Sequence, residues 1–308
     1  MGSYDVIVVG GGPAGLSAGI FCAERGMRVA VFESGSFGGA LVSIYPGKLV
    51  LNYPGFPSGI RAKELAELFI KQARDYGVEL KKERVLEITP QLRVKTDSAQ
   101  YSAKAVVIAT GTRPRELGIP GEAEFNYADL GVYYSVTDPE RFAGRRVLVV
   151  GGGDSALEHA VELSRVASVT LVHRRGEFRA NQKNVERLSR SDVKVLLNTE
   201  VEEIGGESKV EWVKLRSAGG ELKIEVDAVV LAVGHVPNSE IFAKLGLECD
   251  SDGRIKTDAA QRTSVPGIYA AGDIVSGVGH LELLVVAVAQ GAVAAHNIYV
   301  ELYEPYWA

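Results

Sequence analysis

The feature that most constrains the fold of this chain is a glycine-rich loop between a strand and a helix, and it occurs twice. The first copy reads YDVIVVGGGPAG at 4–15, an apolar strand followed by the spacing GxGxxG at Gly10, Gly12 and Gly15. One glycine allows a tight turn, one allows the backbone to approach a pyrophosphate, and one allows a helix to pack on the strand. We predict that helix from Pro13 to Arg25.

An acidic residue completes the first unit. A second predicted strand, 27–32, ends in Glu33, which follows Gly10 by 23 residues. A carboxylate at this point can accept hydrogen bonds from both hydroxyls of a ribose, and the helix N-terminus offers free N–H groups to phosphates. A lone GxGxxG is weak evidence, but strand, helix, strand and acid occur together here. We therefore predict a dinucleotide site.

The second copy keeps the glycine spacing and replaces the acid with bases. It reads RVLVVGGGDSA at 146–156, with Gly151, Gly153 and Ala156 forming GxGxxA. A helix is predicted over 155–164, and the strand at 168–172 leads into HRRGEFRA at 173–180. Guanidinium groups pair with a 2′-phosphate in a bidentate way, whereas a carboxylate would repel it. Arg174, Arg175 and Arg179 therefore favour NADPH over NADH, the alternative being a solvated basic edge.

Two complete units imply two dinucleotides. The simplest pair is a tightly bound FAD and an exchangeable NADPH. Because its acid suits an unphosphorylated ribose, the first site is assigned to FAD.

The remaining strands indicate how the domains are connected. The segments 105–111 and 227–234 are near copies that close the two units, and the strand 265–273 and the apolar helix 281–302 have no partner in the second unit. We predict an α/β fold with two Rossmann-like nucleotide-binding domains of the three-layer ββα type, the second inserted into the first. The FAD-binding domain is 1–114 with 241–308, and the NADPH-binding domain is 115–240. Two chain crossings, near 112–114 and 235–238, would make a hinge.

Composition excludes several classes of protein. With 34 basic and 39 acidic residues, the chain has a formal charge of −5, which argues against binding to nucleic acid or an anionic membrane. The sequence contains no run of 18 or more apolar residues, so no membrane span is predicted. The two cysteines, Cys22 and Cys249, form no CxxC pair, so we expect a cytoplasmic protein without a disulfide framework. No metal site is predicted.

Over essentially its whole length the sequence resembles the thioredoxin-reductase-like flavoproteins. The matching motifs are GGGPAG at 10–15, FGG at 37–39, NYPGFP at 52–57, ATG at 109–111, GGGDSA at 151–156, HRRGEFRA at 173–180, AVGHVPN at 232–238 and AAGD at 270–273. The resemblance implies an FAD site of Gly10, Gly12, Pro13, Ala14, Gly15, Glu33, Gly39, Asn52, Ala109, Gly111, Gly272 and Asp273. It implies an NADPH site of Gly151, Gly153, Asp154, Ser155, Ala156, His173, Arg174, Arg175, Arg179 and Gly234.

The resemblance breaks at the redox-active disulfide. Where thioredoxin reductases have Cys-x-x-Cys, alignment on GGGDSA places Ser135-Val-Thr-Asp138, which cannot exchange thiol for disulfide. The branch without this pair is the thioredoxin-reductase-like ferredoxin–NADP+ reductases, which are homodimers. Similarity to that branch implies that Tyr45 stacks on the flavin. The branch often carries a C-terminal extension over the partner's flavin, and here only Tyr303, Tyr306 or Trp307 could serve, packing at a dimer interface being the alternative.

The predicted acceptor is a ferredoxin or flavodoxin-like protein. Ferredoxins are usually acidic, so docking requires a basic patch, for which Lys71, Lys81, Lys82 and Arg84 are candidates unless they are simply solvated. His280 follows AAGD and is a candidate to approach the flavin.

Two rival functions remain open. One is a thioredoxin-reductase-like or low-molecular-weight disulfide reductase of atypical mechanism, although known enzymes of the latter kind use a cysteine where this chain has Ala14. The other is a non-catalytic redox sensor that binds FAD and NADP.

Overall fold

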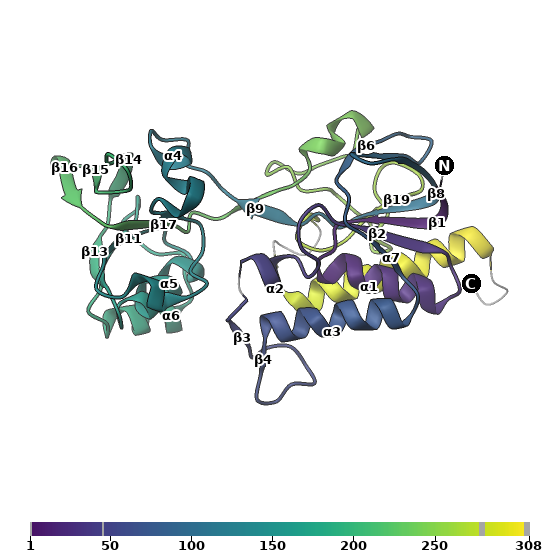
Figure 1. Ribbon diagram of the computed structural model, residues 1–308, viewed down its shortest axis with the longest axis horizontal. Coiled ribbons are helices and arrows are strands. Elements are labelled where there is room, and N and C mark those ends of the chain that lie inside the picture. The colour runs from purple at the N-terminus through teal and green to yellow at the C-terminus, as the bar shows by residue number, and fades with distance from the viewer. Residues whose placement is uncertain (1, 45, 277–280, 305–308) are drawn as a thin grey trace. The chain divides into compact units, whose positions relative to one another are not determined.

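The computed structural model describes residues 2–44, 46–276 and 281–304 (Figure 1). The chain forms two compact units, one made of Met1–Arg113 and Val236–Ala308 and the other of Pro114–His235. The predicted bounds of the inserted domain are 115–240. Each unit has its own sheet and its own core.

The first unit is built on a mostly parallel sheet in the order β5-β2-β1-β8-β7-β6. Its strands are β1 (Gly2–Val9), β2 (Val29–Phe32), β5 (Glu79–Lys81), β6 (Val85–Ile88), β7 (Arg93–Thr96) and β8 (Gln100–Ile108). The central strands are continuous apolar runs because both faces are covered. Val6 pairs with Val29 and Val9 with Phe32, so β1 and β2 end together.

Different elements cover the two faces of this sheet. The helices α1 (Pro13–Glu24), α3 (Ala62–Asp75) and α7 (Leu284–Tyr303) lie side by side on one face (Figure 1). The other face packs against the β6–β7 hairpin and the 3-10 helix η3 (Glu240–Leu245), with Phe242 in the core. Two short elements, α2 (Ala40–Ser43) and the ribbon of β3 (Leu49–Val50) with β4 (Ile60–Arg61), lie between α1 and α3 in the chain.

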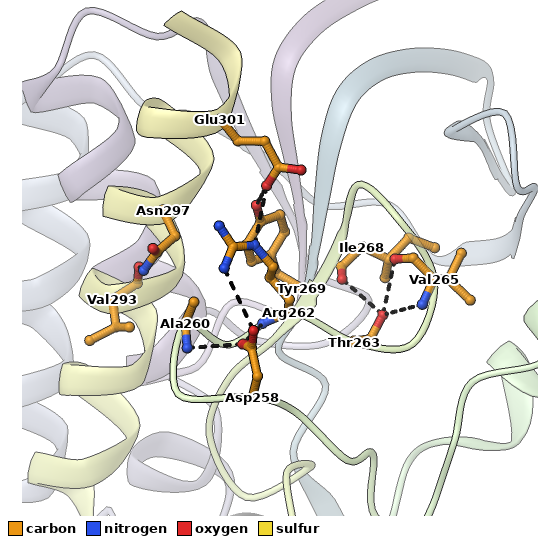
Figure 2. Close-up of polar contacts among 10 residues, drawn as sticks. All are labelled: Asp258, Ala260, Arg262, Thr263, Val265, Ile268, Tyr269, Val293, Asn297 and Glu301. Atoms are coloured by element: carbon orange, nitrogen blue, oxygen red, sulfur yellow. Dashed lines mark hydrogen bonds and ion pairs between the residues drawn. The ribbon is translucent and has the colours of Figure 1, made fainter. Parts of the chain in front are cut away.

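The C-terminal segment joins the first unit. β19 (Ile268–Ala270) pairs in parallel with Val106–Ile108 of β8. The hydroxyl of the buried Tyr269 donates a hydrogen bond to the carboxylate of Glu301 in α7, and Arg262 reaches Glu301 at 3.4 Å (Figure 2). α7 is long and apolar enough to cross a membrane by length and composition alone. It packs closely against α1, because a Cβ on Gly291 would lie 2.2 Å from the carbonyl oxygen of Ala14 and so only glycine allows the two helices to approach this closely.

The second unit repeats the plan. Its parallel sheet has the order β10-β17-β11-β12-β13, built from β10 (Val132–Tyr133), β11 (Arg146–Val150), β12 (Ser168–Val172), β13 (Lys194–Leu196) and β17 (Ala228–Leu231). The helices α5 (Asp154–Leu163) and α6 (Gln182–Ser189) pack on one face. An antiparallel sheet of β14 (Thr199–Gly205), β15 (Trp212–Ser217) and β16 (Gly220–Glu225) packs on the other, and α4 (Glu122–Asn126) precedes it in the chain.

The two connections between the units pair with each other. β9 (Thr112–Pro114) and β18 (His235–Pro237) form a two-stranded ribbon. Asn238, directly after β18, joins the two chain segments at the first-unit end of this ribbon. Its side-chain amide donates to the carbonyl oxygen of Thr110, just before β9, at 2.9 Å. The predicted crossings, near 112–114 and 235–238, therefore coincide with paired strands.

Candidate functional site

A cavity of about 710 Å³ opens at the carboxyl ends of β1, β2 and β8 in the first unit. This is where α/β sheets place their ligands, and the volume is in the range of cofactor sites. Predicted residues that line it are Gly10, Gly12, Pro13, Ala14, Glu33, Gly39, Ala109, Gly111, Gly272 and Asp273.

The glycine loop of this cavity is shaped by contacts that exclude side chains. Gly10 has φ +112°, and a Cβ there would lie 2.2 Å from the carbonyl oxygen of Ala109. A Cβ on Gly15 would lie 1.9 Å from the carbonyl oxygen of Gly10, and Gly15 does not line the cavity. Gly12 faces open space toward Gly39 and caps α1 without a side-chain bond. The first N–H groups of α1 are thus free to bind a phosphate.

Glu33 is held in place by the backbone. One carboxylate oxygen accepts the N–H of Gly11 at 2.8 Å, and the other accepts the N–H of Gly35 at 2.6 Å. The carboxylate lines the cavity at the end of β2, so its remaining lone pairs can accept ribose hydroxyls. The glycine cradle, the acid and the volume together fit the predicted FAD.

A second carboxylate, Asp273, lies in the same cavity after β19. Burial, and then the neighbouring Glu282, raise the pKa of Asp273 to about 6, while Arg254 opposes the shift. The Arg254 guanidinium is 8% exposed; it donates to the carbonyl oxygen of Asp273 and pairs with Glu282 at 2.5 Å. The N–H of Gly272 donates to the side chain of Gln290 at 2.8 Å, which ties this turn to α7.

Some predicted FAD residues lie elsewhere, and some lining residues were missed. Asn52 is exposed in the loop between β3 and β4 and does not line the cavity. Tyr45 and His280 lie outside the described residues, as do Tyr306 and Trp307. The missed lining residues are Val9, Phe32, Ser34, Ala40, Leu41, Ser43, Ile44, Glu83, Arg84, Val85, Leu86, Thr110, Thr112, Arg113, Asn238, Glu240, Ile241, Ala271, Glu282, Leu283, Leu284 and Ala287. Four of them belong to quoted motifs, Val9 to YDVIVVGGGPAG, Thr110 to ATG, Asn238 to AVGHVPN and Ala271 to AAGD, and no local motif marks the others.

The glycine loop of the second unit has the same construction. A Cβ on Gly151 would lie 2.2 Å from the carbonyl oxygen of Ala232, and Gly153 faces open space. Asp154 and Ser155 then begin α5, whose N-terminus has no side-chain cap. Gly234, with φ +101° and open space around it, lies at the end of the neighbouring strand β17.

The three predicted phosphate-binding arginines lie on one exposed loop after β12. Arg174, Arg175 and Arg179 form no ion pair within the described part of the chain. The N–H of Arg179 donates to the carbonyl oxygen of Gly152 at 2.8 Å, which ties the arginine loop to the glycine loop. This geometry fits the predicted NADPH, because unpaired guanidinium groups lie beside a free helix N-terminus.

The side chain of His173 packs against this loop. Its ring is buried, stacks on Phe178 and lies against Gly152, where any Cβ would meet it at 2.3 Å. Burial, helped by the charges of Arg175 and Arg174, lowers the pKa of His173, so the ring is neutral at pH 7.

Asp154 fastens the other end of the arginine loop. Its carboxylate accepts the backbone N–H of Asn181 at 2.9 Å and the buried amide of Asn184 at 2.8 Å. Asn181 caps α6, so Asp154 joins the start of α5 to the start of α6.

The segment that replaces the redox-active disulfide has structural roles. Asp138 accepts the N–H of Glu140 at 3.1 Å and caps the 3-10 helix η2 (Pro139–Phe142). Val136 is buried in the core of the second unit. Burial raises the pKa of the Cys22 thiol to about 12, and burial and Asp250 raise the pKa of Cys249.

Within the described ranges no group of three or more His, Cys, Asp and Glu side chains could hold a metal ion.

Comparison with known proteins identifies relatives of the whole chain. A family model described as pyridine nucleotide-disulphide oxidoreductase matches residues 4–291. A ferredoxin–NADP reductase of Thermus thermophilus is 37% identical over 95% of this chain and 91% of its own length. A thioredoxin reductase of Mycolicibacterium smegmatis is 41% identical over 88% of each chain. The crystal structure of Lactococcus lactis thioredoxin reductase covers 98% of this chain and 100% of its own, with 32% identity and a TM-score of 0.89. The predicted fold class and resemblance are confirmed.

Proposed function

The chain belongs to the pyridine nucleotide-disulphide oxidoreductase family, and we propose that it reduces a ferredoxin or flavodoxin-like protein with NADPH, without a redox-active disulfide. It is an oxidoreductase that uses FAD and NADP(H). The observation that carries the proposal is the segment Ser135–Asp138, which holds a helix cap and a core valine where a thiol pair would be needed. With no thiol to carry electrons onward, the acceptor must meet the flavin itself.

The proposed reaction balances with two acceptors. One NADPH and two oxidised one-electron carriers give NADP+, one proton and two reduced carriers. FAD supplies the conversion between a two-electron donor and one-electron acceptors. The chain supplies binding and orientation. In the first unit, the N–H groups at the start of α1 would hold the pyrophosphate of FAD, and Glu33 would accept hydrogen bonds from its ribose.

The second unit selects the electron donor, NADPH. Its three free arginines would pair with a 2′-phosphate, and Asp154 and His173 hold their loop against the glycine loop. We assign NADPH to this unit and FAD to the first. We further propose a cytoplasmic homodimer; the low cysteine content supports that location.

Anaerobic stopped-flow absorbance tests the proposal. The purified protein with FAD is mixed with NADPH or NADH, and the reduced protein is then mixed with ferredoxin, flavodoxin or thioredoxin. We expect rapid bleaching by NADPH, slower bleaching by NADH, and reoxidation by ferredoxin or flavodoxin only. Equal reduction by NADH, or efficient reduction of thioredoxin, would contradict the proposal. If NADPH fails to bleach the flavin, that result would favour a non-catalytic redox sensor instead.

A disulfide substrate is the second candidate, and the 41% identity to a thioredoxin reductase favours it. It requires a thiol–disulfide couple, of the chain or of the substrate, whose disulfide takes up electrons from the flavin. Cys22 is fully buried, and Cys249 is exposed but carries a thiol whose pKa is raised. Thioredoxin reduction that disappears in a Cys249→Ala variant would support this candidate.

A further inference from the structure

A segment next to the cavity has the opposite charge to the rest of the molecule. The chain carries 39 acidic residues and a net charge of −5, yet residues 34–63 contain none. The same 30 residues contain three cations, Lys48, Arg61 and Lys63, all exposed. Neither Arg61 nor Lys63 forms an ion pair with a described residue.

The structure gathers these cations on one projecting ribbon. We define the β3–β4 lobe as residues 46–61, which project from the α1–α3 side of the first unit (Figure 1). Leu49 pairs with Arg61 across the ribbon, and the N–H of Ala62 donates to the carbonyl oxygen of Lys48 at 2.9 Å. The backbone thereby fixes Lys48, Arg61 and Lys63 at the same base of the lobe.

The lobe also exposes apolar side chains between its cations. Leu49 is 48% exposed and Leu51 is 70% exposed. The opposite side of the lobe is anchored, because Tyr53 stacks on Phe56 and meets the edge of Phe69 in α3. An apolar centre with a charged rim on a held backbone is the usual composition of a protein-binding surface.

The lobe begins close to the wall of the cavity. Leu41, Ser43 and Ile44, in and just after α2, line the cavity. Lys48 follows Ile44 by four residues, so their Cα atoms lie within roughly 14 Å of each other. A protein bound on the lobe would therefore sit next to the opening of the proposed flavin site.

We propose that the β3–β4 lobe, with Lys63, is the docking surface for an acidic electron-carrier protein. This rests on the proposed function, in which the acceptor must approach the flavin directly. Complementary charge guides such a carrier to this acid-free segment beside the cavity and holds it away from acidic parts of the surface.

The lysines and the arginine that the sequence offers for this role are placed less favourably. Lys71 pairs with Asp75 on α3, and Lys81 lies 3.9 Å from Glu79. Arg84 lines the cavity itself. Lys82 is exposed, but the acidic Glu83 directly follows it in the chain.

A matched pair of charge reversals tests the docking surface. The sequence RAK at 61–63 and the sequence RVK at 93–95 each carry two exposed cations on or beside a strand of the first unit. The test variant is Arg61→Glu with Lys63→Glu, and the control is Arg93→Glu with Lys95→Glu, which changes the net charge equally. Both are assayed as FAD-loaded full-length protein with NADPH, using ferredoxin and the small neutral acceptor benzoquinone. A second test variant, Leu51→Ser, removes apolar area without changing charge.

The proposal predicts that the test variant loses about tenfold or more in kcat/KM for ferredoxin at low ionic strength, with benzoquinone reduction unchanged. The loss should shrink at high salt, and the control should match the wild type. Equal losses in both variants, or none in the test variant, would overturn the docking surface while leaving the proposed function intact. A change of oligomeric state in the test variant, seen by light scattering, would also overturn it, because the lobe would then contact a second copy. A wild type that reduces benzoquinone and no carrier protein would instead refute the proposed function.

Discussion

The two glycine loops have nearly the same backbone, but the strand that follows each loop leads into side chains of opposite charge. In the first unit Val9 pairs with Phe32, and in the second Val150 pairs with Val172, so both helices begin at the same point of their sheets. After those strands, Glu33 is fixed by two backbone N–H groups, whereas Arg174 and Arg175 are exposed and form no ion pair within the described residues. The difference shows how one scaffold can select an unphosphorylated or a phosphorylated ribose through a few side chains.

The third position of the glycine motif gives the largest expected effect. Gly15→Ala would place a methyl group 1.9 Å from the carbonyl oxygen of Gly10, so the loop cannot keep its shape. We expect a protein that retains almost no FAD, as measured by the absorbance of the purified protein. The matched change in the second unit, Ala156→Gly, should retain FAD fully and cost about 1 kcal/mol of stability. Equal FAD retention in both variants would remove the contrast between the loops.

The arginine loop gives the next largest effect. Arg174→Ala with Arg175→Ala removes charge-assisted bonds to a 2′-phosphate, each worth about 1.5–3 kcal/mol. We expect kcat/KM for NADPH to fall by about 100-fold or more, with NADH unchanged. Arg165→Ala, on the exposed surface after α5, is the control. Parallel losses for NADPH and NADH would show that these arginines do not read the phosphate.

Asp273 provides a prediction about pH for the first unit. Its pKa in the folded protein, about 6, lies above the ordinary value of 3.8, so the folded state holds the proton more tightly. The carboxyl therefore costs stability as pH rises from about 4 to about 6, by up to roughly 3 kcal/mol. In flavin-free protein, Asp273→Asn should be more stabilising at pH 7 than at pH 4, as measured by urea unfolding. A stability difference that is independent of pH would contradict this.

Asp154 gives the smallest effect and sharpens the account of the second unit. Asp154→Ala frees the Asn181 end of the arginine loop, so NADPH should bind about fivefold more weakly, at the roughly 1 kcal/mol expected of a hydrogen bond. NADH affinity should change less, because the loop reads only the 2′-phosphate. Titration calorimetry with 2′,5′-ADP and 5′-AMP measures both. Equal weakening of the two ligands would assign Asp154 to the pyrophosphate instead.

The sequence predicted the features that depend on local pattern. The strand–loop–helix units, Glu33 and the arginines follow from spacing and charge, and Gly10, Gly12, Ala109 and Asp273 line one cavity. Glu83 to Leu86 and Glu240 could not be found this way, because β6 and η3 reach the cavity only through the antiparallel hairpin and the returning chain. The cap made by Asp138 was not predicted, although an aspartate directly before Pro139 and Glu140 is typical of a helix start.

The central claim is that electrons leave the flavin without any thiol of this chain, and the chain has only two cysteines. The most direct measurement is the rate of ferredoxin reduction by NADPH in Cys22→Ala, in Cys249→Ala and in the variant with both changes, each normalised to bound FAD. The account predicts that all three keep the wild-type rate per flavin, since the buried Cys22 and the isolated Cys249 carry no electrons. A loss of ferredoxin reduction in any of them, with the flavin still bleached by NADPH, would contradict it.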